Sequence, residues 1–165
     1  MNNIILIGMP GSGKSTAGVL SAKGLLKNFF DTDLLIQNLE NDLLQNIIDK
    51  KGNDYFLTCE EKAILSLDID GTVIATGGSV VYSDKAMQHL KKMGRVIYLH
   101  LDYDVMMSRI KNVSTRGVVL KNGKTFKDMY DERLPLYEKY ADMVIDCNDR
   151  TVEETVVDIM NAAKM

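Results

Sequence analysis

The stretch Gly8–Thr16 reads GMPGSGKST and matches the pattern G-x-x-x-x-G-K-[ST]. It follows the apolar run NIILIG and opens a segment with helical spacing, KSTAGVLSAKGLL. A strand, a glycine-rich turn and a helix in this order surround phosphate oxygens with backbone N–H groups and the positive end of a helix. The stretch therefore predicts a binding site for a nucleoside triphosphate. It does not identify the molecule to which a phosphoryl group would be transferred.

Each residue of this loop has an expected task. Glycines allow the backbone N–H groups to point inward, Lys14 can reach the β- and γ-phosphates, and the Ser15 hydroxyl can ligate Mg²⁺. We therefore predict Mg²⁺ as the metal. The predicted nucleotide-binding residues of the loop are Gly11, Ser12, Gly13, Lys14, Ser15 and Thr16.

Strand-like and helix-like segments alternate along the rest of the chain. The runs FFDTD, GTVIAT, RVIYLHL and MVIDC are expected as strands, and helical patterns fall at 84–93, 103–112, 126–141 and 151–163. Residues 34–69 read as helical throughout, with a break near KKGND. Such alternation predicts one α/β domain over residues 1–165, with a parallel sheet and helices on both of its faces.

The segment 113–124, VSTRGVVLKNGK, fits none of these elements. It is polar, and it carries two glycines and an arginine. Long loops inside compact α/β domains are often functional. We therefore predict that this segment is a lid over the site.

Composition excludes several classes of partner. The 165 residues carry a formal net charge of −3, so bulk charge does not favour nucleic acid. No apolar run reaches the roughly 18 residues that span a bilayer, and no signal-peptide pattern precedes the first strand. We expect a cytoplasmic protein that does not bind membranes. Cys59 and Cys147 are expected as two reduced thiols, because they lie far apart without a metal-binding pattern.

Two carboxylates, Asp31 and Asp33, end the second predicted strand. In an extended chain residues two apart point to the same side, so both could face the site. Asp31, nearer the strand, would suit Mg²⁺ through water, and Asp33 could accept a hydrogen bond from an acceptor hydroxyl. The alternative is that Asp33 or Thr32 only caps a helix that starts at Leu34.

Four motifs, GMPGSGKST, FFDTD, ATGGSVV and ERLPLYEKYAD, follow one another with the spacing of the shikimate kinase family. The chain resembles that family over its whole length. The resemblance implies a P-loop kinase fold of the nucleoside-monophosphate-kinase type, with a five-stranded parallel sheet in the order 2-3-1-4-5. It also implies transfer of the γ-phosphoryl group of ATP to the 3-hydroxyl of shikimate, and residues 34–69 as the substrate-binding helical region.

The resemblance also assigns residues to the acceptor side of the site. Asp33 resembles the acid that binds the acceptor hydroxyls and serves as the proposed base. Gly77 and Gly78 match a glycine triplet whose backbone contacts the substrate, and Ser79 stands where the third glycine is usual. Arg133, in ERLPLY, resembles an arginine that binds the substrate carboxylate.

On the nucleotide side the resemblance adds three arginines. Arg109 resembles an arginine beside the adenine, Arg116 resembles the arginine of the lid, and Arg150 is a weaker match near the adenine. The predicted catalytic group is therefore Asp33, Lys14 and Arg116, with Ser15 and Asp31 at the metal.

One departure from the family pattern bears on the acceptor. The family usually reads G-x-x-x-F-R-x-x-E where this chain reads GNDYFLTCEE: Gly52, Phe56 and Glu60 keep their places and Leu57 replaces the arginine. That arginine usually pairs with the substrate carboxylate. A charged hydrogen bond contributes about 1.5–3 kcal/mol, so its loss predicts shikimate binding that is weaker by tens- to hundredfold.

Four functions follow from these observations. The first is an ATP-dependent kinase with shikimate as acceptor, acting as a monomer. The second, favoured by Leu57, is a kinase of the same fold for a different polyol, hydroxy acid or hydroxy amino acid. A nucleoside monophosphate kinase fits less well, because residues 34–69 contain no arginine to hold a monophosphate. A regulatory nucleotide-binding module would not need Asp33, Arg116 and Arg133.

Overall fold

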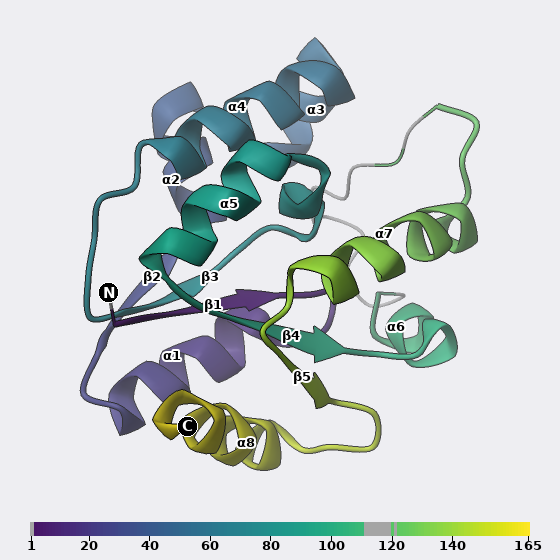
Figure 1. The fold of residues 1–165 in the computed structure, drawn as a ribbon. Coiled ribbons are helices and arrows are strands. Elements are labelled where there is room, and N and C mark those ends of the chain that lie inside the picture. Colours follow the sequence, from purple (N-terminus) through teal and green to yellow (C-terminus); the bar gives the residue numbers. More distant parts are fainter. Residues whose placement is uncertain (1, 111–119, 121) are drawn as a thin grey trace.

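The central feature of the computed structural model, which describes residues 2–110, 120 and 122–165, is one parallel sheet (Figure 1). Its strand order is β2-β3-β1-β4-β5, which confirms the predicted fold class and order. The strands are β1 (Asn3–Ile7), β2 (Asn28–Asp31), β3 (Thr72–Ala75), β4 (Gly94–His100) and β5 (Met143–Asp146). All five residues of β1 are buried, as expected for a central strand with both faces covered.

Helices cover both faces of this sheet. In Figure 1, α1 and α8 pack together below the sheet, and α4 and α5 lie above it. The helices are α1 (Lys14–Gly24), α2 (Thr32–Glu40), α3 (Leu44–Lys51), α4 (Asn53–Leu65), α5 (Asp84–Met93), α6 (Tyr103–Ile110), α7 (Phe126–Tyr140) and α8 (Val152–Lys164). A short 3₁₀ helix, η1 (Gly78–Tyr82), follows the third strand, at a place where no helix was predicted.

The region 34–69 is three helices, so the prediction of one helical stretch with a single break was incomplete. The expected break is present, because Gly52 separates α3 from α4 with a φ of 87°. A second break follows α2, which ends at Asn41 in the left-handed conformation with a φ of 51°, a conformation that asparagine tolerates better than most residues. Residues 66–69 lie beyond the end of α4 and are not helical.

These three helices share a small hydrophobic core of their own. Its buried members are Ile36, Leu44, Ile47, Phe56 and Ala63, and Leu57 packs against them while partly buried. A separate, larger core lies around the sheet. The segment that is predicted to bind the substrate is therefore packed as a unit beside the sheet.

Part of the lid prediction falls outside the described residues. Residues 113–119 and 121, and with them Arg116, are not described. The predicted helix at 103–112 corresponds to α6, which is described up to Ile110. Within the described part of the chain, none of the helices is both long and apolar enough to span a bilayer.

Candidate active site

The phosphate-binding loop, Gly8–Gly13, joins β1 to α1 as the sequence predicted. Gly8 has a φ of 151°, and a Cβ atom there would lie 2.6 Å from the carbonyl oxygen of Leu99. The loop thus runs closely past the end of β4, where only glycine fits. Gly13 precedes α1 with a φ of 87°, so the positive end of the helix opens onto the loop.

Lys14 places its ammonium group inside this loop. Its Nζ donates to the carbonyl oxygens of Gly8 and Met9 at 2.8 and 3.0 Å, and to the Ser12 hydroxyl at 3.4 Å. The residue is only 8% exposed. A cation held at the centre of a ring of backbone groups can exchange these carbonyl contacts for phosphate oxygens when a nucleotide arrives.

The two residues predicted at the metal are in direct contact. Ser15 Oγ donates a hydrogen bond to Asp31 Oδ2 at 3.0 Å. Ser15 stands in the exposed first turn of α1, and Asp31 is the last residue of β2. A hydroxyl and a carboxylate oxygen beside a phosphate loop fit Mg²⁺, which tends to take one or two protein ligands together with phosphates and waters.

Asp31 is also the residue that caps α2, so the alternative that Asp33 or Thr32 caps this helix is wrong. Its Oδ1 accepts a hydrogen bond from the backbone N–H of Asp33 at 2.9 Å, and the helix begins at Thr32 rather than at Leu34. The carboxylate of the last strand residue reaches the N–H two positions on, which is an ordinary N-cap. Asp33 therefore lies in the first turn of α2, and the argument that both acids share one side of an extended strand does not hold.

Gly77 lies between two carboxyl groups. A Cβ atom on this residue would be 2.7 Å from Glu60 Oε2 and 2.9 Å from Asp33 Oδ1. Any side chain at position 77 would displace one of these acids. The structure thus brings Asp33 to the glycine pair, as predicted, and places a second acid, Glu60, beside it.

Glu60 was not predicted as a site residue. It is 2% exposed, its Oε1 accepts a hydrogen bond from Ser79 Oγ at 2.7 Å, and its Oε2 has no hydrogen-bond partner among the described residues. Burial, with a further contribution from the charge of Asp33, raises the pKa of Glu60 to about 7. The sequence carried two signals: Glu60 keeps its place in the family pattern, and it stands four residues after Phe56, on the same buried face of a helix.

Arg133 closes the other end of the glycine pair. A Cβ atom on Gly78 would lie 2.9 Å from Arg133 Nη1 and 3.3 Å from Pro10 Cδ in the phosphate-binding loop. Tyr137, one turn further along α7, donates its hydroxyl proton to the Gly78 carbonyl oxygen at 2.6 Å. Arg133 is 1% exposed, which requires well-placed partners for its charge. The structure therefore brings Asp33 and Arg133 to the glycine pair, next to the phosphate-binding loop.

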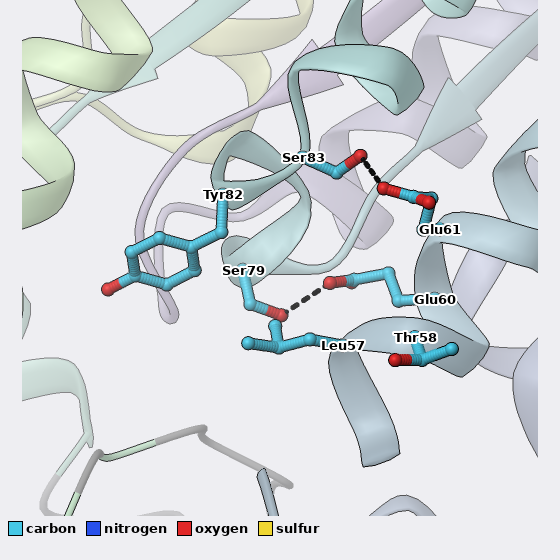
Figure 2. A pocket seen from close by; sticks show the side chains of 7 residues that line it. All are labelled: Leu57, Thr58, Glu60, Glu61, Ser79, Tyr82 and Ser83. Carbon is cyan, nitrogen blue, oxygen red and sulfur yellow. Dashed lines mark hydrogen bonds between the residues drawn. The ribbon is translucent and has the colours of Figure 1, made fainter. Parts of the chain in front are cut away.

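A pocket of about 170 Å³ opens beside these residues (Figure 2). Leu57 and Ser79, at the positions where the resemblance implies an arginine and a glycine, both line it, although they lie on different elements. Tyr82 of η1 lines it as well, and Arg133 Nε donates to the Tyr82 hydroxyl at 3.3 Å. The complete lining consists of Leu57, Thr58, Glu60, Glu61, Ser79, Tyr82 and Ser83.

The arginines predicted on the nucleotide side differ in their placement. Arg109 Nη1 donates to the Gly11 carbonyl oxygen at 3.1 Å and its Nη2 to that of Cys147 at 3.3 Å, so it ties the loop to the end of β5. Arg150 pairs with Asp158 of α8 at 3.7 Å; no hydrogen bond between it and the loop is found within the described ranges. Arg116 lies outside the described residues.

Comparisons with known proteins identify the family of this chain. The shikimate kinase family model matches residues 10–164. A shikimate kinase from Clostridium botulinum is 37% identical over 168 residues, covering 99% of this chain and 97% of that protein. One from Caldanaerobacter subterraneus is 33% identical over 165 residues, covering 98% and 96%.

A solved structure leads to the same family. The shikimate kinase from Acinetobacter baumannii, in complex with shikimate, matches with a TM-score of 0.89 and 27% identity, covering 98% of this chain and 92% of that one. The family model and the relatives thus extend over nearly the whole chain. The chain belongs to the shikimate kinase family.

Proposed function

We propose that this protein transfers the γ-phosphoryl group of ATP to the 3-hydroxyl of shikimate. The observation that carries the proposal is the pair Gly77–Gly78, which has the Asp33 carboxyl on one side and the Arg133 guanidinium on the other. Shikimate is a hydroxylated ring with one carboxylate. An acid for a hydroxyl and a cation for the carboxylate are the groups that such an acceptor needs.

The phosphate-binding loop supplies the donor side. Because Pro10 lies close to Gly78, an acceptor on the glycine pair lies next to the loop that holds the triphosphate. We propose that Lys14 binds the β- and γ-phosphates. The Ser15 hydroxyl and the Asp31 carboxylate would hold Mg²⁺, which neutralises charge on the phosphates when bound.

Asp33 would orient the acceptor hydroxyl and take its proton late in the reaction. Phosphoryl transfer has a loose transition state, so catalysis depends mainly on positioning and on charge stabilisation. Because the backbone of Asp33 is fixed at the start of α2 by its bond to Asp31, its carboxyl is held in place by the fold. The proposed lid at 113–124 would bring Arg116 to the phosphates and exclude water.

Leu57 supports a second candidate, a kinase of the same family for a different polyol, hydroxy acid or hydroxy amino acid. The side chain lines the acceptor-side pocket and offers no charge to a carboxylate. An acceptor with its carboxylate only at Arg133, or with none, would suit this pocket.

One assay separates these candidates. ADP release is measured without acceptor, and then with shikimate, quinate, homoserine, gluconate and nucleoside monophosphates in turn, and the phosphorylated product is identified by mass spectrometry. We expect the highest kcat/KM with shikimate. A higher value with another acceptor would overturn the proposal in favour of the second candidate, and ADP release that no acceptor stimulates would overturn both. Light scattering on the same sample tests the predicted monomer.

A further inference from the structure

One described arginine, Arg133, lies against the glycine pair, where the resemblance to the family pattern implies two arginines for the acceptor. Arg133 is buried and lies against Gly78, while Leu57, at the position of the usual second arginine, is an apolar side chain packed on the small core of α2, α3 and α4. A carboxylate that leaves water needs donors for both of its oxygens. With leucine at 57, the donors that an arginine there would add to those of Arg133 are absent, so other donors that line this pocket are candidates for that contact.

Tyr82 is in the right place to be that donor. It lines the same pocket as Leu57 and, like Ser79, belongs to η1 (Figure 2). Its ring centroid is 5.2 Å from Arg133 Cζ, and its hydroxyl oxygen accepts from Arg133 Nε at 3.3 Å. The phenol, which lines the pocket, is thus in direct contact with the buried guanidinium of Arg133.

The direction of the hydrogen bond between them matters. Since Arg133 Nε donates, the Tyr82 oxygen is the acceptor, and the phenol proton must point toward a different group. An anion beside the guanidinium can receive that proton together with an N–H of Arg133. Two donors from different elements, η1 and α7, then converge on one carboxylate.

Two acids line this pocket, and one of them, Glu61, accepts a hydrogen bond from Ser83 Oγ. The other, Glu60, opposes such a ligand less than an ordinary carboxylate would. Ser79 donates its hydroxyl proton to Glu60 Oε1 at 2.7 Å, and burial raises the pKa of Glu60 to about 7. A large fraction of Glu60 is therefore neutral near pH 7, which limits its repulsion of an incoming carboxylate.

Resting on the proposed function, we propose that Tyr82 is an acceptor-binding, specificity-determining residue whose hydroxyl holds the substrate carboxylate together with Arg133. Its hydroxyl donates to the carboxylate in place of the arginine that the family pattern usually has at position 57. The contact is specific to acceptors with a carboxylate, so Tyr82 also separates shikimate from neutral polyols.

The first test is Tyr82→Phe, which removes one oxygen and keeps the ring on Arg133. We expect the KM for shikimate to rise about tenfold or more, from the loss of a charged hydrogen bond, while kcat and the KM for ATP stay within about twofold of the wild type. Tyr140→Phe is the matched control, because its hydroxyl binds Asp84 at 2.6 Å outside the pocket. We expect no change in the KM for shikimate in that variant.

A second variant separates direct contact from support of Arg133. Arg133→Lys keeps a cation and removes the Nε–H that donates to Tyr82. If Tyr82 touches the substrate, Tyr82→Phe still raises the KM in the Arg133→Lys background; if it acts only through Arg133, it adds nothing there, which overturns direct binding. Should Arg133→Lys not fold, ζ-¹³C-tyrosine NMR replaces it: the Tyr82 resonance, assigned by its loss in Tyr82→Phe, must shift on addition of shikimate, and an unmoved resonance overturns the contact.

The outcomes also separate this inference from the proposed function. Wild-type protein that does not phosphorylate shikimate overturns the proposed function and this inference with it. Wild-type protein that phosphorylates shikimate, beside a Tyr82→Phe variant with an unchanged KM, overturns this inference alone.

Discussion

Asp31 and Asp33 are joined by a hydrogen bond from the backbone N–H of Asp33 to Oδ1 of Asp31, at 2.9 Å. The other oxygen of Asp31 accepts from Ser15 at 3.0 Å. One carboxylate therefore links the phosphate-binding loop to the helix that carries the second acid. A shift of Asp31 is expected to disturb both the metal side and the acceptor side of the site.

Two substitutions at Asp31 separate its structural role from its metal role. Asparagine is as good an N-cap as aspartate, whereas loss of the cap costs about 1 kcal/mol. We expect Asp31→Asn to keep the free energy of unfolding but to need more Mg²⁺ for half-maximal activity. Asp31→Ala should lower the free energy of unfolding and also raise the Mg²⁺ concentration needed for half-maximal activity. Urea unfolding and Mg²⁺ titration measure these two effects. An unchanged Mg²⁺ requirement in Asp31→Asn would remove this residue from the metal site.

Asp33→Asn tests the proposed base. General-base catalysis contributes about 10²- to 10⁴-fold, so we expect kcat to fall within that range. ATP affinity, measured by calorimetry, should stay nearly unchanged, because Asp33 is predicted on the acceptor side. A variant with turnover close to the wild type would exclude Asp33 as the base.

Lys14→Ala tests the phosphate-binding loop. The ammonium group lies inside the loop, where it contacts the carbonyl oxygens of Gly8 and Met9 and the Ser12 hydroxyl. We expect kcat/KM for ATP to fall by about a hundredfold or more, as on loss of a preorganised charge-stabilising donor. The loss should be equal for every acceptor that is phosphorylated. Steady-state kinetics at saturating acceptor measures it, and a loss that depends on the acceptor would contradict the assignment.

Glu60 predicts a pH dependence of stability. Its pKa is raised by burial from the ordinary 4.5 to about 7, so the folded protein binds this proton more tightly than the unfolded chain does. As the pH rises from about 4.5 to about 7, the free energy of unfolding should fall by up to about 3 kcal/mol from this group, and it should level off above that window.

Glu60→Gln provides the measurement. The variant should lose this part of the pH dependence in urea unfolding between pH 4.5 and 7.5. Glu153→Gln, at an exposed position of α8, is the control and should follow the wild type. If the free energy of unfolding depended on pH equally in all three proteins, Glu60 would ionise at an ordinary pKa in the folded state.

The sheet and the loop could be predicted from the sequence because their patterns are local. A buried apolar strand followed by a glycine loop and a helix at Lys14 leaves few alternative folds, and alternating elements fix a parallel sheet. Ser15 and Asp31 could be paired because the loop before Ser15 and Asp31 itself both lie at the carboxyl ends of strands of one parallel sheet.

The acceptor side was less predictable, since its contacts join distant segments. The positions of Glu60 and Tyr82 depend on how α4 packs against η1, and η1 has no periodic signal in its five residues. The cap on α2 was missed for a different reason. Asp31, Thr32 and Asp33 are all acceptable N-cap residues, so composition alone could not select among them.

The leucine at position 57 also has a pharmacological consequence. An inhibitor that places an apolar group against Leu57, in the pocket of about 170 Å³, would gain the free energy of burying that group. The same group would meet a charged guanidinium in relatives that carry the usual arginine, where desolvation of the charge costs affinity. Leu57 would therefore allow an inhibitor to bind this protein more tightly than relatives that carry an arginine at this position.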